Sequence, residues 1–233
     1  ADSCDSIHTL NVTVNYTPTA NAGIDTIICS DQTYTVNGSA TNDSSVIWTT
    51  NGDGNFNNPG QNITTYNPGP NDINNGSVIL TFTAVGNYPC TDAIDQMVLN
   101  ITQEPTANAG IDTIICSDQN YIVNGSATND SSVIWTTNGD GNFNNPGQNI
   151  TTYNPGPNDI NNGSVILTFT AVGNYPCGSI SDQMVLNIDS VTYGISDTVV
   201  CELMNWNGNI INTSGTYIDT LVNANNCDSI HTL

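Results

Sequence analysis

Apolar and polar residues alternate along several short stretches of the chain, which is the pattern of half-buried β-strands. The alternation is strict in Leu10–Tyr16, and in the longest stretch Val78, Leu80, Phe82 and Ala84 fall on one face. The predicted strands of the first half, rich in Val, Ile, Thr and Tyr, are Ile24–Cys29, Tyr34–Val36, Val46–Thr50, Ile63–Tyr66, Ser77–Val85 and Gln96–Ile101. No segment has a sustained helical period, so we expect an all-β fold.

The stretch 18–104 recurs almost letter for letter as 105–191, at a period of 87 residues, with nine positions changed. About seven short strands in such a repeat indicate a β-sandwich, with Trp48 as its core anchor. Asn–Gly pairs at Asn37, Asn51 and Asn75 are turn-formers that can adopt positive φ. We therefore expect tandem Ig-like sandwiches in an extended rod or filament.

A second repeat joins the two ends of the sequence: the heptapeptide CDSIHTL occupies 4–10 and again 227–233. We interpret the chain as one larger repeat with a short overlap. The expected units are 1–17 (the terminal strand of a preceding small β unit), 18–104 and 105–191 (the two Ig-like repeats), and 192–233 (a small disulfide-linked β unit, incomplete at its C-terminus).

The amino-acid composition excludes some classes of binding partner. The chain has 21 Asp and Glu, no Lys or Arg, and a net charge of −21. Without cations it has no electrostatic basis for binding nucleic acid or anionic lipid surfaces, and no Lys or Arg for Schiff-base or phosphate chemistry. Seven Cys suggest disulfides and an oxidising, extracellular setting. No signal peptide or membrane-spanning apolar run is visible, so we expect any export signal or anchor to lie outside this segment.

Spacing suggests which cysteines pair. Cys29 and Cys90 are 61 residues apart, as are Cys116 and Cys177. We expect one internal disulfide per repeat, pinning loops at one end of the sandwich and contributing about 4 kcal/mol.

The remaining cysteines lie in the small unit. If residues after CDSIHTL continue as at the start, NVTVNY is its missing last strand, and Cys201 pairs with Cys227. Cys4 would then pair with the counterpart of Cys201 in the preceding unit. The missing strand is supplied either by continuation of the polypeptide or by the next subunit in trans, because an unpaired sheet edge is costly.

The loop NGDGNFNN places oxygen side chains at alternate positions, as calcium-binding loops do. The candidate ligands are Asn51, Asp53 and Asn55, and in the second repeat Asn138, Asp140 and Asn142. A turn built from Asn–Gly and Asp–Gly has the same appearance, and the loop lacks a distal bidentate Glu. Calcium is the one cofactor considered.

The segments CELMNWNGN and SGTYIDTLVNANNCDSIHTLNVTV resemble short modules found in many copies in giant surface and secreted proteins of Bacteroidota. The 87-residue unit, with AGIDTIICSDQ, SSVIWTTNGDGNF and DQMVLNI, is similar to the Ig-like or PKD-like repeats of those proteins. The resemblance implies export by type IX secretion, a cell-surface location and a place in a gliding-adhesin-like stalk. The complete absence of Lys and Arg departs from that family.

The same organisms O-glycosylate Asp-Ser/Thr-apolar triplets, so the resemblance implies acceptors here. They are Ser6, Thr26, Thr113, Ser190, Thr198, Thr220 and Ser229. The alternative is that Asp-Thr-Ile is ordinary strand-entry sequence.

The residue types present in the repeats limit the functions that the chain can have. Both His residues, His8 and His231, are the same position of one motif, and the repeats contain no His, Lys or Arg. No catalytic triad can be assembled, and the carboxylates are scattered on turns. We predict a non-enzymatic structural segment of a surface filament or adhesin stalk, whose partners are identical units head to tail in one chain or filament, with glycans or surfaces as further ligands. The alternative is an array of carbohydrate-binding modules.

Overall fold

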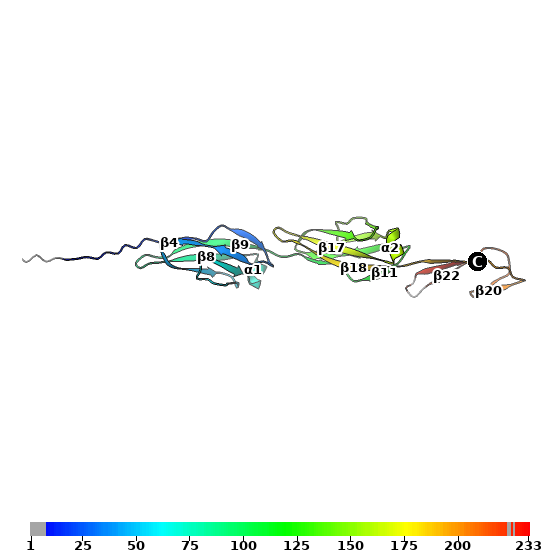
Figure 1. Cartoon of the computed structure of the whole chain (residues 1–233). Coiled ribbons are helices and arrows are strands. Elements are labelled where there is room, and N and C mark those ends of the chain that lie inside the picture. The colour runs from blue at the N-terminus through cyan, green and yellow to red at the C-terminus, as the bar shows by residue number, and fades with distance from the viewer. Residues whose placement is uncertain (1–7, 223–224, 226) are drawn as a thin grey trace, which may run out of the picture. The chain divides into compact units, whose positions relative to one another are not determined.

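The computed structural model describes residues 8–222, 225 and 227–233 (Figure 1). The chain divides into two compact units. One contains the chain up to Glu104 together with Tyr175–Cys177, and the other contains Pro105–Asn174 and Gly178–Leu233. The regular secondary structure of the described residues is strand, apart from two short helices, and each 87-residue repeat is an Ig-like β-sandwich.

The first repeat consists of β1 (Thr19–Asn21), β2 (Thr26–Cys29), β3 (Tyr34–Asn37), β4 (Ser39–Thr41), β5 (Asp43–Thr50), β6 (Asn55–Phe56), β7 (Ile63–Asn67), α1 (Pro70–Asn75), β8 (Ser77–Gly86) and β9 (Ala93–Thr102). One sheet has the order β2-β9-β8-β5, the facing sheet has the order β3-β7-β6, and β1 pairs with β4. Strand β2 runs parallel to β9, with Cys29 opposite Thr102.

The second repeat consists of β10 (Thr106–Asn108), β11 (Thr113–Cys116), β12 (Tyr121–Asn124), β13 (Ser126–Thr128), β14 (Asp130–Thr137), β15 (Asn142–Phe143), β16 (Ile150–Asn154), α2 (Pro157–Asn162), β17 (Ser164–Gly173) and β18 (Ser179–Asp189). Its sheets repeat those of the first copy, with the orders β11-β18-β17-β14 and β12-β16-β15. Near-identical sequences therefore give the same topology twice.

The core of each sandwich lies between the two sheets. Trp48 is buried, and its ring centroid lies 4.7 Å from that of Phe82 on the neighbouring strand. Tyr66 closes the core from the facing sheet. The prediction of Trp48 as core anchor, and of one buried face along β8, is confirmed.

The short helix α1 was not expected from the sequence. It begins at Pro70 and ends at Asn75, and Gly76, with a φ of 75°, is its C-cap. Proline suits a first helical turn and glycine a left-handed C-cap. The helix contributes Asp72 to the interior, where this carboxylate is 1% exposed.

The C-terminal segment forms two small sheets within the second unit. Its strands are β19 (Thr192–Ile195), β20 (Met204–Trp206), β21 (Asn209–Ile211), β22 (Ile218–Val222) and β23 (Asp228–Thr232). Strand β23 pairs antiparallel with β22 and parallel with β19, and β20 forms a hairpin with β21. The hairpin turn uses Asn207 and Gly208, both at positive φ.

Candidate functional site

Two disulfide bonds join cysteines that belong to successive repeats of the sequence. Cys29 is bonded to Cys177, 148 residues later, with a Cα–Cα distance of 4.9 Å. Cys116 is bonded to Cys227, 111 residues later, with a Cα–Cα distance of 5.4 Å. In the sequence, each bond therefore connects the first cysteine of one 87-residue repeat to the second cysteine of the repeat or C-terminal segment that follows. In the fold, each bond lies within one compact unit, because Tyr175–Cys177 belongs to the first.

The expected pairing inside each repeat is wrong. Cys29 lies opposite Thr102, at the end of β9, whereas Cys90 lies in the turn that precedes the start of β9. A ten-residue strand spans about 30 Å, and a disulfide requires Cα atoms within about 7 Å. The two cysteines of one repeat are therefore at opposite ends of the sandwich.

The other two pairing predictions have different outcomes. Cys201 is not bonded to Cys227, because Cys227 is bonded to Cys116. Among the described cysteines, Cys90 and Cys201 are free thiols. Cys4 lies outside the described residues, so its predicted bond to a preceding unit stays a prediction.

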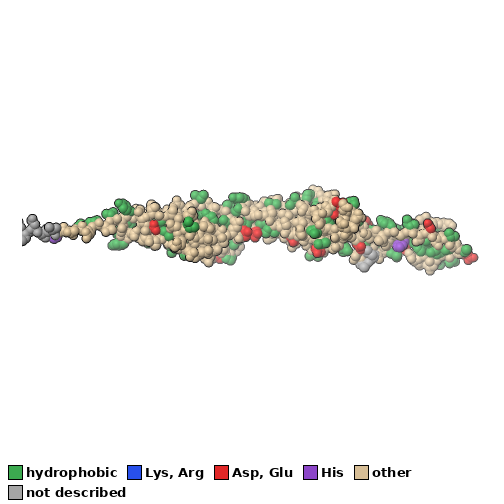
Figure 2. All heavy atoms as spheres, in the orientation of Figure 1, with side chains coloured by type: hydrophobic (Ala, Val, Ile, Leu, Met, Phe, Trp, Pro, Cys, Tyr) green, Lys and Arg blue, Asp and Glu red, His purple; other side chains and the backbone are tan. Residues whose placement is uncertain are grey.

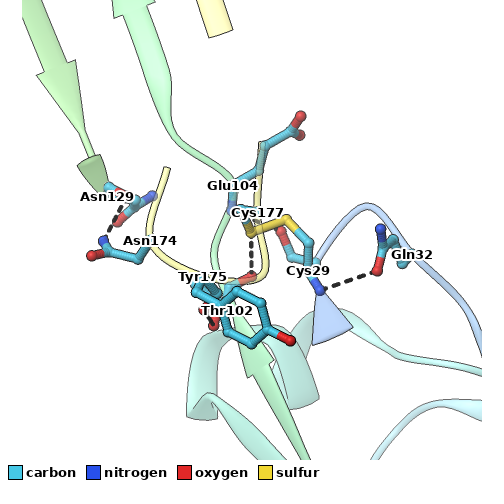
Figure 3. The surroundings of a disulfide bond; sticks show 9 residues. Cys29, Gln32, Thr102, Glu104, Asn129, Asn174, Tyr175 and Cys177 are labelled. Atoms are coloured by element: carbon cyan, nitrogen blue, oxygen red, sulfur yellow. Dashed lines mark hydrogen bonds between the residues drawn. A yellow bond between two sulfur atoms is a disulfide. The ribbon is translucent and has the colours of Figure 1, made fainter. Parts of the chain in front are cut away.

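Short polar contacts place the first disulfide (Figure 3). The hydroxyl of Thr102 donates a hydrogen bond of 3.1 Å to the carbonyl oxygen of Tyr175, and the Sγ atom of Cys177 lies 3.3 Å from the carbonyl oxygen of Thr102. The same carbonyl accepts the backbone N–H of Ser30 at 2.9 Å. The last residue of β9 thus holds both the loop that contains Cys177 and the segment that follows Cys29.

The second disulfide is placed in a similar way. Cys116 lies opposite Asp189, the position equivalent to Thr102. The carbonyl of Asp189 accepts the N–H of Ser117 at 2.9 Å, and its carboxylate accepts a hydrogen bond of 2.9 Å from the side-chain amide of Asn225. Cys227 is 1% exposed. The same arrangement therefore surrounds both disulfide bonds, as expected for two copies of one repeat.

The carboxylate of Asp72 organises the loop in which calcium was considered. It accepts backbone N–H groups of Asp53, Gly54 and Gly69 at 3.0 to 3.2 Å and the hydroxyl of Tyr66 at 2.6 Å. Asp159 receives the equivalent four hydrogen bonds in the second repeat. Burial, and next the hydrogen bond to Asp72, raise the pKa of Tyr66 above the ordinary value of a tyrosine.

The proposed calcium ligands also bind backbone groups. Asn51 and Asn138 accept the N–H of Ile79 and Ile166 at 2.9 Å, and Asp53 and Asp140 accept N–H groups at the start of α1 and α2. The backbone carbonyl of Asn55, and that of Asn142, accepts a side-chain amide. Within the described part of the chain, no group of three or more His, Cys, Asp or Glu could hold a metal ion. Hydrogen bonding accounts for the oxygen-rich pattern, and calcium stays a hypothesis.

The glycosylation candidates differ in exposure. Ser190, Thr198 and Thr220 are exposed, whereas Thr26, Thr113 and Ser229 are half-buried. Ser6 lies outside the described residues. Half-buried hydroxyls leave less room for a glycan, so the exposed three are the best candidates.

Acidic side chains are scattered among polar and hydrophobic ones on the face shown in Figure 2. Among the described residues, no helix has the length and apolar content needed to cross a membrane.

No protein-family model and no curated protein matches the sequence. Solved structures with similar folds include three tandem Ig proteins. The immunoglobulin domains 1–4 of Sidekick-1 are 17% identical over 74% of this chain and 48% of that one, with a TM-score of 0.43. The insect immune protein hemolin is 11% identical over 72% and 46%, with a TM-score of 0.46. The titin fragment I67–I69 is 11% identical over 92% and 95%, with a TM-score of 0.45. The chain thus spans about half of the first two.

Proposed function

We propose that this chain is a structural repeat segment of an extracellular surface filament or adhesin stalk, in which disulfides connect each unit to the next. The observation that supports the proposal is the bonding of Cys29 to Cys177 and of Cys116 to Cys227, each across a repeat boundary in the sequence. A disulfide confined to one sandwich would stabilise that sandwich alone. A disulfide to the following unit also keeps the chain continuous when the peptide between units is cut.

This linkage suits a stalk that bears load outside the cell. Closing loops of 148 and 111 residues contributes about 5 kcal/mol each in the chain-entropy model. Such bonds persist in oxidising compartments, which supports an extracellular location. Export by type IX secretion and O-glycosylation at Ser190, Thr198 and Thr220 belong to the proposal through the resemblance to Bacteroidota surface proteins.

A nicked tether tests the mechanical role. A recognition sequence for a specific protease is inserted between Gln103 and Glu104, and the chain is held between two beads under force. We expect the cleaved tether to survive in oxidising buffer and to break when reductant is added, because Cys29–Cys177 bridges the cut. The matched control is Cys29→Ser, in which cleavage alone should break the tether. A wild-type tether that breaks on cleavage without reductant would contradict the proposed role.

A further inference from the structure

Two cysteines of the described residues, Cys90 and Cys201, are free thiols. The three units share the motif Asp-Thr followed by two apolar residues and Cys, which ends at Cys29, Cys116 and Cys201. The first two of these cysteines are bonded to the following unit, and Cys201 is exposed and free. The second cysteines of the three units are Cys90, Cys177 and Cys227. Cys177 and Cys227 are bonded to the first cysteine of the preceding unit, and Cys90 is free.

The surroundings of Cys90 match those of Cys177. Asn15, 87 residues before Thr102, donates a hydrogen bond of 2.6 Å from its side-chain amide to the carbonyl oxygen of Tyr88. The Sγ atom of Cys90 lies 3.5 Å from the carbonyl oxygen of Asn15. These are the counterparts of the contacts from Thr102 to the loop of Cys177. Cys90 is therefore held in the place where a second cysteine receives the first cysteine of the unit before it.

The parallel register of β19 and β23 identifies that first cysteine. Thr192 lies opposite Ser229, and the pairing continues until the N–H of Ser196 donates to the carbonyl oxygen of Thr232 at 2.8 Å. The same register places Ser196 beside Leu233, which is the Leu10 position of the recurring heptapeptide. If this register continued for five more residues, Cys201 would lie opposite the Asn15 position. Cys29 and Cys116 lie opposite the equivalent positions, Thr102 and Asp189.

Exposed apolar side chains give an independent indication. Val12 and Val14 are 69% and 67% exposed, although their counterparts 87 residues later, Leu99 and Ile101, are buried in β9. Val200 is 49% exposed, whereas its counterpart Ile28 is buried. The segment 11–15, where a strand was predicted, and the segment 197–201 are not strands in this structure. Both carry exposed apolar side chains whose counterparts in the repeats are buried between neighbouring strands.

A groove lies beside the segment 197–200 and the end of β23. It has a volume of about 570 Å³ and is lined on its apolar side by Ile195, Val199, Met204, Ile211 and Leu233. Its lining includes the end of the sheet at Leu233 and most of the segment before Cys201. An extended segment that continues β23 would enter this groove and pair with that segment.

We propose that a second copy of this chain occupies the groove, with its residues 11–15 forming a parallel strand beside 197–201 and its Cys90 forming a disulfide with Cys201. Two thiols lose two protons and two electrons to an oxidant such as glutathione disulfide, which is reduced to two glutathione thiols. This inference rests on the proposed role as a tandem segment. It gives Cys201 the partner Cys90 of a second copy, in place of the predicted partner Cys227, which is bonded to Cys116.

Complementary variants test the disulfide. Both carry Cys4→Ser, one adds Cys90→Ser and the other adds Cys201→Ser. In a glutathione redox buffer, we expect each variant alone to stay monomeric at 24.6 kDa and their mixture to give a dimer of twice that mass on a non-reducing gel. Peptide mapping should find Cys201 bonded to Cys90, with Cys29–Cys177 and Cys116–Cys227 intact in both chains. A mixture that dimerises no faster than either variant alone would overturn the proposal.

A second pair of variants tests the strand. Val12→Asp with Val14→Asp, placed in the partner that keeps Cys90, should slow dimer formation at least tenfold, because both side chains enter the groove. Thr13→Asp changes charge on the opposite face of the same strand and should leave the rate within twofold. Equal rates for the two would show that no strand inserts. Neither assay involves the bond that holds the nicked tether, so this proposal and the proposed function can fail separately.

Discussion

The buried carboxylate of Asp72 provides a sharp test of how each sandwich is held together. In Asp72→Ala, three backbone N–H groups, those of Asp53, Gly54 and Gly69, and the hydroxyl of Tyr66 lose their acceptor. Hydrogen bonds to charged groups contribute about 1.5 to 3 kcal/mol, and each buried donor left unpaired costs about 1 to 3 kcal/mol. Because water can reach some of these donors once the side chain is removed, we expect a loss of about 3 to 5 kcal/mol.

Hydrogen exchange measures this loss locally. A change of 1.4 kcal/mol is tenfold in an equilibrium constant, so a loss of about 3 to 5 kcal/mol should make amides in 63–76 exchange about 10² to 4 × 10³ times faster in the variant. The equivalent amides in 150–163 provide an internal reference, because Asp159 is unchanged. Asp31→Ala removes the same charge from an exposed position of the first repeat and should leave exchange nearly unaltered. An effect no larger than that of Asp31→Ala, or one equal in both repeats, would refute the reasoning.

Three further outcomes follow from the structure. Because the pKa of Tyr66 is raised by burial and by Asp72, the folded state holds the phenol proton more tightly than the unfolded state does. Tyr66 therefore adds to the free energy of unfolding below about pH 10, and this stability is lost as the pH rises above it. Urea melts should show the free energy of unfolding falling above about pH 10, with a smaller fall in Tyr66→Phe. Gly38→Ala should cost about 1 to 3 kcal/mol in thermal melts, since its Cβ would lie 2.8 Å from the ring of Phe82, whereas Gly60→Ala should be neutral. Trypsin should leave even the reduced, unfolded chain uncut on a gel, because it contains no Lys or Arg.

Strand alternation predicted most of the fold. The six strands expected in the first repeat correspond to β2, β3, β5, β7, β8 and β9. The helix α1 was missed because six residues are too few to show a helical period. Its proline start and glycine end were nevertheless visible in the sequence.

The Asn–Gly pairs were predicted to be turns that can adopt positive φ, and this explanation applies to some of these glycines only. Gly76, after Asn75, does have a positive φ. Gly38, after Asn37, is instead required because a Cβ would contact the rings of Trp48 and Phe82 at 2.8 Å. Such a contact depends on how the sheets pack, which a local pattern does not specify.

The disulfide pairing could not be obtained from spacing alone. A separation of 61 residues leaves open which end of β9 each cysteine occupies, and the parallel pairing of β2 with β9 decides it. The motif that ends at Cys29, Cys116 and Cys201 marks these cysteines as equivalent. Pairing within units and pairing between units both respect that equivalence, so the motif does not decide between them.

Cleavage at methionine tests the linkage between units most directly. With Cys4→Ser in place and free thiols alkylated, cyanogen bromide cuts after Met97, Met184 and Met204. Under non-reducing conditions we expect one species in which 1–97, 98–184 and 205–233 remain joined, while 185–204 is released with alkylated Cys201. Release of 1–97 and 98–184 as separate fragments, with 185–204 joined to 205–233, would show that each unit closes its own disulfide and would contradict the account.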